Sequence, residues 1–231
     1  MTVIIRENTI EVDALTDEDV LSIEDNVEVY KRALYFDLEH YVYKHPICIG
    51  VFGCAYYDEN NRALKVTQYM LEGKREIKDI LIMALNYFID ARDVLKKDYI
   101  VTFSGNNDFY VINYLLDKYN LKFDFKNTFK EIDLQKVFEE KLKGNIGLKA
   151  LEKKVGIKRE GELISGSTLA KTFGKVVKDK DYINRMPQEK IEKILLYNEQ
   201  DVVNLFHILT KWNTISIEEE VKVEEPEEIE S

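Results

Sequence analysis

The chain has 231 residues, of which 45% are hydrophobic and 33% charged, with only 3 Pro and 10 Gly. This composition is typical of a globular protein that can bury a sizeable core, and it excludes collagen-like, mucin-like and wholly disordered chains. The formal net charge of -10, taken as a whole, argues against a nucleic-acid partner, because domains that bind nucleic acid usually carry excess positive charge.

The negative charge is concentrated at the C-terminal end. Residues 217–231 contain eight Glu and one Lys and contribute -7, so the preceding residues carry only -3. We expect residues 214–231 to form a disordered acidic tail. Residues 141–180 instead hold eleven Lys or Arg and four acidic residues, a local charge of +7. This basic segment indicates either solvated helix faces or a groove that follows a phosphate backbone, so the net charge does not exclude nucleic acid.

Cysteine usage and hydropathy bear on the compartment. Cys48 and Cys54 lie six residues apart in an apolar run, and on one strand they would point the same way and could not bridge each other. We therefore expect two reduced core thiols, as in a reducing cytosol. No apolar stretch approaches the roughly 18 residues of a membrane span, and the N-terminus lacks a signal-peptide pattern. A cytoplasmic location without a membrane partner is the resulting expectation.

The order of the predicted elements favours an α/β fold. Strands at 33–39, 47–58 and 63–71 are expected to form an antiparallel meander, and a later strand, tight turn and helix form a crossover unit. We predict a mixed sheet, with this three-stranded meander plus parallel strands, flanked by helices in one domain over residues 31–213, after an extension at 1–30. The elements after the meander are a helix at 74–92, a strand at 99–104, a helix ending at 120, a strand at 125–134, and helices at 135–143, 147–155, from 167, and from 187 to 212.

Two carboxylates lie on one side of the first strand of this meander. Asp37 and Glu39 are two positions apart, and side chains at i and i+2 of a strand project from the same face of a sheet. Because neighbouring acids repel each other, a divalent cation that prefers hard oxygen ligands is their natural partner. Taken alone, the pair is also compatible with an exposed strand face in an acidic protein.

Three further residues could belong to the same site. Tyr197 and Asp201 lie four residues apart in the last predicted helix and share a face that borders the core. Asp108 lies in the turn SGNNDF at 104–109, between a predicted strand and a helix, which is where open sheets bind ligands. Each also has an ordinary interpretation, as a boundary Tyr beside a solvated Asp and as an acid at a helix N-terminus.

The combination of these motifs, in this order and on these elements, resembles the DEDD 3′–5′ exonucleases of the RNase H-like superfamily. Those enzymes carry Asp-x-Glu on the first strand, an Asp after a later strand and Tyr-x-x-x-Asp on the last helix. YNEQDV at 197–202 is similar to the Tyr-bearing, DEDDy class. More narrowly, GLKALEKKVGIKREGELISGS at 147–167 resembles the Leu-Lys-x-x-Glu, Gly-Ile-x-Arg and Gly-Ser segment of the YprB-like ribonuclease H-like family. The resemblance spans residues 33–210.

The resemblance implies an RNase H-like fold and a hydrolase that shortens DNA or RNA from the 3′ end, at single strands or frayed ends. Asp37, Glu39, Asp108 and Asp201 would bind two divalent cations, Mg²⁺ or Mn²⁺, and Tyr197 would orient the attacking water. Two cations about 4 Å apart can activate a water, hold the scissile phosphate and stabilise the leaving oxygen, and such a site needs a cluster of carboxylates.

The middle motif departs from the family pattern. The family has Asn-Gly-x-x-Phe-Asp, whereas residues 104–109 read Ser-Gly-Asn-Asn-Asp-Phe. In strict register Phe109 takes the place of the catalytic Asp. A turn that is one residue tighter would let Asp108 reach the metals, and we expect this second arrangement, because an acid at this turn would otherwise be a coincidence.

The first motif departs as well. Glu39 is followed by His40 and Tyr41, where many relatives have Thr-Thr-Gly in a loop that contacts substrate, so the substrate preference is left open. His40, His45 and His207 lack the spacing of metal ligands, and we assign no role to them.

Two other hypotheses remain open at this point. The exchange of Asp108 and Phe109 is compatible with a catalytically inactive nucleic-acid-binding or scaffold module on the same fold. The acidic tail is compatible with a protein-interaction adaptor, which would lose its partner when residues 216–231 are deleted. Convergence of the four carboxylates within metal-bridging distance would favour the enzyme.

Overall fold

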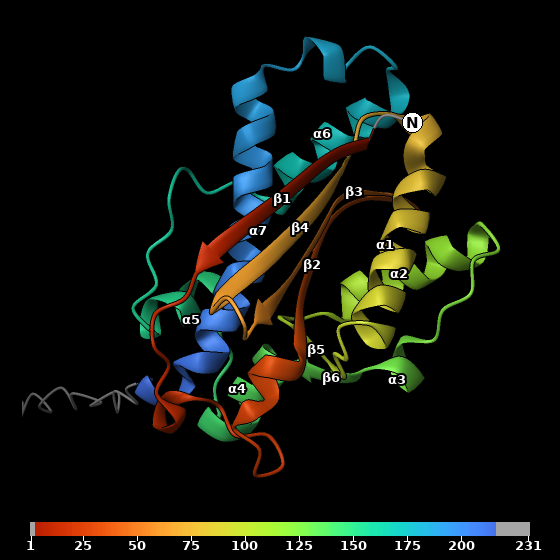
Figure 1. The fold of residues 1–231 in the computed structure, drawn as a ribbon. Coiled ribbons are helices and arrows are strands. Elements are labelled where there is room, and N and C mark those ends of the chain that lie inside the picture. Colours follow the sequence, from red (N-terminus) through yellow and green to blue (C-terminus); the bar gives the residue numbers. More distant parts are fainter. Residues whose placement is uncertain (1–2, 216–231) are drawn as a thin grey trace, which may run out of the picture.

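A six-stranded mixed sheet forms the centre of the protein (Figure 1) in a computed structural model that describes residues 3–215. The strand order is β1-β4-β3-β2-β5-β6. In this order, the neighbouring strands β1, β4, β3 and β2 are antiparallel to one another. Strands β5 and β6 continue the sheet in parallel with β2. The predicted fold class, including the antiparallel meander and its parallel extension, is therefore confirmed. The strands are β1 (Val3–Glu11), β2 (Ala33–Tyr43), β3 (His45–Asp58), β4 (Ala63–Leu71), β5 (Tyr99–Thr102) and β6 (Lys130–Asp133).

Helices cover both faces of the sheet. Helices α1 and α2 pack on one face, and the C-terminal half of α7 packs on the other together with α4 and α5. In Figure 1, α1 (yellow) and α7 (blue) lie on opposite sides of the strands. The α-helices of the described residues are α1 (Ile77–Asp93), α2 (Asn106–Lys118), α3 (Phe125–Thr128), α4 (Leu134–Leu142), α5 (Leu148–Lys154), α6 (Gly166–Lys178) and α7 (Gln188–Thr210). Short 3₁₀ helices lie at Asp17–Asp19, Glu28–Arg32, Lys74–Glu76, Ile183–Arg185 and Trp212–Thr214.

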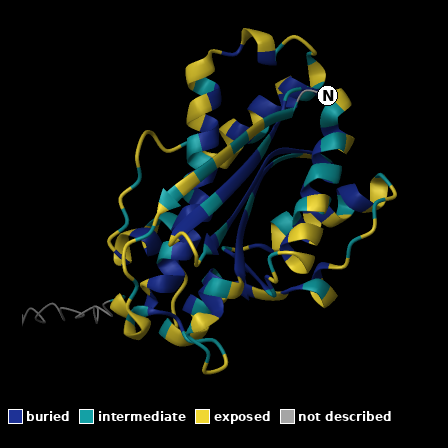
Figure 2. Ribbon diagram, viewed as in Figure 1, coloured by how far each residue is buried: buried dark blue, intermediate teal, exposed yellow. Residues whose placement is uncertain are grey.

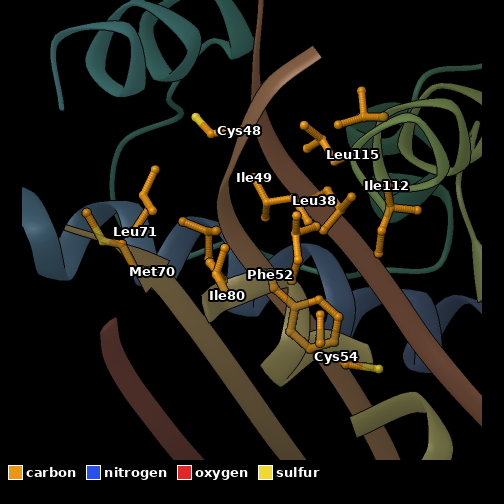
Figure 3. Packing of buried hydrophobic residues seen from close by; sticks show 14 of the residues in the cluster. Leu38, Cys48, Ile49, Phe52, Cys54, Met70, Leu71, Ile80, Ile112 and Leu115 are labelled. Carbon is orange, nitrogen blue, oxygen red and sulfur yellow. The ribbon is translucent and has the colours of Figure 1, made fainter. Parts of the chain in front are cut away.

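The strand β2 contributes to a separate core on each of its faces. Leu34, Phe36 and Leu38 belong to the cluster under α1 and α2. Figure 3 shows Leu38 of β2 and Phe52 of β3 in this cluster, together with residues of α1 and α2. Tyr35 points the opposite way and stacks edge-on against Phe206 of α7, with ring centroids 5.4 Å apart. Because both faces are covered, the inner strands are buried along most of their length, as Figure 2 shows.

Two segments differ from the sequence predictions. Residues 125–134, expected as one strand, form the helical turn α3 followed by the short strand β6. The reason is local: Asp124 caps the turn, and its side chain accepts a hydrogen bond from the backbone N–H of Asn127. At the N-terminus, Val3–Glu11 pairs with β4 as an edge strand, so part of the predicted extension at 1–30 belongs to the sheet.

The structure tests some of the remaining predictions and leaves others untested. Both Cys48 and Cys54 are buried and unpaired, as expected for core thiols. No helix within residues 3–215 has the length and apolar character needed to cross a membrane. Residues 216–231, which make up most of the predicted acidic tail, lie outside the described residues, so the predicted division into extension, domain and tail remains a prediction.

Candidate active site

Three of the four predicted acids converge where α7 crosses β2. Asp37 and Glu39 project from the same face of β2 as Tyr35, and this is the face that α7 covers. Asp201 is buried on α7 and completes the group. One carboxylate oxygen from each of the three residues lies within 4.8 Å of the others. Elements far apart in the sequence therefore supply a compact cluster of hard oxygen donors.

A buried amide holds α7 against the sheet beside this cluster. Asn198 is fully buried, and its Nδ2 donates a hydrogen bond of 2.9 Å to Oδ2 of Asp37. Its Oδ1 accepts a bond of 2.8 Å from Nε2 of Gln68 on β4. Gly53 of β3 makes this approach possible, because a Cβ at that position would overlap Asn198 Oδ1. Sequence reasoning missed Asn198, although its position three residues before Asp201 places it on the same helix face.

The electrostatics of the cluster favour a bound cation. Burial, followed by the negative charge of Asp201, raises the pKa of Asp37 to about 7. Burial together with Asp37, Asp201 and Asp108 raises the pKa of Glu39 well above its usual range. Both shifts mean that the charged carboxylates repel each other in a poorly solvated place. A divalent cation among them would relieve this repulsion, and the donor set fits Mg²⁺ or Mn²⁺.

The exchanged Asp108 and Phe109 occupy opposite environments at the start of α2. Phe109 is partly buried and packs against the core, with its ring centroid 5.8 Å from Phe36 and 5.4 Å from Phe125. Asp108 is mostly buried beside the acid cluster, with its Oδ1 3.8 Å from Nε2 of His40. Burial, followed by the charges of Asp37 and Asp201, raises its pKa well above the usual range. It lies next to the compact group of three acids but is not a member of it.

The turn before α2 is shaped by an unusual backbone conformation. Ser104 has a φ of 57°, in the left-handed region, and its N–H donates a hydrogen bond of 2.9 Å to Oδ1 of Asp133. Asp133 also caps α4, where its Oδ1 accepts a bond from the N–H of Gln135. This buried acid therefore fixes the turn that presents Asp108.

His40 joins β2 to α2 beside the acids. Its Nε2 lies 2.8 Å from Nδ2 of Asn107 and 3.8 Å from Oδ1 of Asp108. An amide nitrogen is a donor, so Nε2 of His40 accepts and the ring is neutral, in agreement with burial lowering the pKa of His40. The pairing of β2 with β3 shifts between Glu39 and His40, which leaves Gly50 as an extra residue on β3. The sequence indicated no role for His40, and the structure places it at the edge of the site.

Two basic side chains contact one oxygen of Asp201. Lys149 of α5 and Arg159 from the loop after α5 both reach Oδ1 of Asp201. Arg159 also forms a two-point ion pair with buried Glu152, which in turn accepts a hydrogen bond of 3.1 Å from Nδ2 of Asn204. Sequence reasoning assigned no site role to these residues. The signal was present, because Lys149, Glu152 and Arg159 are the charged positions of the Leu-Lys-x-x-Glu and Gly-Ile-x-Arg motifs.

The ring of Tyr197 lies beneath the side chains of Lys149 and Arg159. Nζ of Lys149 is 4.7 Å from the centroid of its ring, and Cζ of Arg159 is 5.3 Å away. Burial, followed by the charge of Asp201, raises the pKa of Tyr197, so its hydroxyl stays protonated at neutral pH. The structure thus brings Tyr197 to the cluster beside Asp201.

Comparison with known proteins agrees with this geometry. A family model described as the RNase_H superfamily matches residues 34–213. The matched segment begins at β2, ends after α7 and contains every residue of the candidate site. A search of the curated proteins found no match. On the strength of the family match, the chain belongs to the RNase H superfamily.

Proposed function

We propose that this protein is a metal-dependent 3′–5′ exonuclease of the DEDDy type, within a YprB-like branch, that hydrolyses phosphodiester bonds of DNA or RNA. Membership in the RNase H superfamily already suggests a nuclease that acts on nucleic acid. The observation that carries the proposal is the convergence of Asp37, Glu39 and Asp201 within 4.8 Å, on two elements that pack face to face. The proposed substrate is a single strand or a frayed end.

Each site residue has a role in this proposal. Asp37, Glu39 and Asp201 would hold two divalent cations, Mg²⁺ or Mn²⁺, with Asp108 as a further ligand from the start of α2. When bound, the cations would lower the pKa of the attacking water, hold the scissile phosphate and stabilise the leaving oxygen. Asn198 orients Asp37 through its 2.9 Å hydrogen bond. The protonated hydroxyl of Tyr197 orients the attacking water.

The test uses oligonucleotides labelled at either end, as DNA and as RNA, with Mg²⁺ or Mn²⁺. A 3′–5′ exonuclease releases a 3′ label at once as mononucleotide, converts a 5′-labelled strand into a ladder, and leaves a circular single strand intact. Asp201→Asn should lower the rate more than about 100-fold, because it removes a ligand. The matched control Asp117→Asn removes an exposed acid from α2 and should keep the wild-type rate. Undiminished activity in Asp201→Asn would refute the assignment, and cleavage of the circle would replace it by an endonuclease.

A specific observation favours a second candidate, a catalytically inactive nucleic-acid-binding module. Phe109, which takes the catalytic register of the family motif, packs against the core, and Asp108 lies outside the compact group of three acids. Such a module would bind oligonucleotides without shortening them, and Mn²⁺ would not raise its melting temperature. Turnover together with stabilisation by Mn²⁺ would exclude it.

A further inference from the structure

Asp201 has more positively charged neighbours than the other two acids of the cluster. Its Oδ1 is shared by Lys149 and Arg159. Asp37 has only the neutral amide of Asn198 as a hydrogen-bond partner, and Glu39 forms no ion pair within residues 3–215. Both basic side chains that contact the cluster are therefore paired with Asp201, the one acid of the three that β2 does not supply.

Arg159 is firmly held in this position. Its side chain is only 8% exposed, and its Nε donates a 2.7 Å bond to Oε2 of Glu152 while Nη2 contacts both Glu152 and Asp201. The charge of Arg159 is thus balanced by Glu152 independently of Asp201. A planar guanidinium paired at two points is a rigid element.

Lys149 is held far less firmly. Its side chain is 31% exposed, and its ammonium has Asp201 as its one ion-pair partner among the described residues, with the ring of Tyr197 beneath it. A lysine side chain is flexible and strongly hydrated, so it can leave a contact at the cost of little packing.

A divalent cation bound to the three acids would lie close to both groups. It would bind a carboxylate whose Oδ1 already contacts an ammonium and a guanidinium, and like charges this close repel strongly in a partly buried site. Arg159 is retained by Glu152, so Lys149 is the group that can move.

We infer that Lys149 is an exchangeable counter-ion of Asp201, which leaves the carboxylate when a divalent cation binds to Asp37, Glu39 and Asp201, whereas Arg159 stays in place. This inference rests on the proposed function, because it requires a metal at the acid cluster. The freed ammonium remains beside the site at the start of the basic segment 141–180, where a phosphate of the substrate is its next anionic partner.

The direct test is the rate at which an amine-reactive reagent labels each lysine, measured by mass spectrometry on the full chain with and without Mg²⁺. Release from Asp201 should raise labelling of Lys149 by about threefold or more, because the amine loses its anionic partner. Lys154, an exposed lysine of the same helix, is the internal control and should keep its rate. Metal binding is followed in parallel by calorimetry with Mn²⁺.

Variants separate exchange from a general effect of charge. Lys149→Gln should lower the dissociation constant for Mn²⁺ by about tenfold, because the metal no longer competes with an ammonium. Lys149→Arg keeps the competing charge and should leave the constant at or above the wild-type value. Lys154→Gln removes the same charge from the same helix and should change it little.

The outcomes distinguish this inference from the proposed function. Metal binding with unchanged labelling of Lys149, or equal effects of Lys149→Gln and Lys154→Gln, would overturn the exchange and leave the nuclease proposal standing. Exchange without hydrolysis of oligonucleotides would support the inference and refute the nuclease. Failure of Mg²⁺ and Mn²⁺ to bind would overturn both.

Discussion

The two faces of β2 show how one strand serves stability on one side and chemistry on the other. Leu34, Phe36 and Leu38 face α1 and α2 in a core of apolar side chains. On the opposite face, Tyr35 packs against α7, but the next two side chains, Asp37 and Glu39, are acids with raised pKa values. Burial of hydrocarbon on the first face stabilises the fold. The second face holds carboxylates that repel each other, and a bound cation would relieve this repulsion.

The comparison of the two faces shows that the geometry of the acid site depends on the apolar core on the other side of β2. The apolar face anchors the strand that carries two of the acids. Hydrogen bonds of Asn198 to Gln68 and Asp37, and the close approach at Gly53, hold α7 against the sheet. Substitutions on the two faces should therefore separate stability from metal binding.

The largest expected effect comes from the apolar face. Leu38→Ala, between the two acids in sequence, should lower the free energy of unfolding by about 3 kcal/mol, because it leaves a cavity under α1 and α2. Hydrolysis per folded molecule should stay close to wild type. Urea unfolding and rate measurements check this, with Leu34→Ala as the matched change further from the acids. A loss below about 1 kcal/mol would contradict the assignment of this face to the core.

A smaller effect, of opposite sign, is expected from the acidic face in the absence of divalent metal. The pKa of Asp37 is raised to about 7, so the folded protein keeps a proton that the unfolded chain loses near pH 4. The free energy of unfolding should therefore fall as pH rises from about 4 to about 7 and be lowest above that range. Asp37→Asn should stabilise the protein at pH 8 by on the order of 2 kcal/mol and have little effect near pH 4.

Urea unfolding in a chelating buffer at several pH values measures this dependence. Asp117→Asn, which removes an exposed acid on α2, serves as the control for net charge. If Asp37→Asn and wild type show parallel pH profiles, the acids of β2 do not repel each other in the folded state.

The smallest of the three effects concerns the amide that joins the faces of the site. Asn198→Ala removes the hydrogen bond to Asp37 and leaves Gln68 without its side-chain partner. We expect the affinity for Mn²⁺ to fall by about tenfold, since partners that orient a metal ligand typically contribute that much. Calorimetric titration checks this against Asn113→Ala, an exposed asparagine of α2. Equal affinities in the two variants would show that Asn198 acts in packing alone.

The sequence by itself determined most of the elements and the chemical nature of the site. The alternation at 33–39 and the helical spacing of Tyr197 and Asp201 are local patterns, and local patterns survive without knowledge of the fold. They placed Asp37 and Glu39 on one strand face and Asp201 on a helix, as the structure has them. The helical turn at Phe125–Thr128 was not predicted, because its capping residue, Asp124, lies before the apolar run that indicated a strand.

Only the tertiary structure decided which partners the acids have. Asn198 reaches Asp37 across 161 residues, and Lys149 and Arg159 reach Asp201 across 52 and 42 residues. It also decided that Phe109 packs against the core while Asp108 lies beside His40 and the acids. These outcomes depend on how closely α7 approaches the sheet and on the direction in which a turn leaves β5. Periodicity specifies which face a side chain occupies, whereas the packing of distant elements specifies what that face meets.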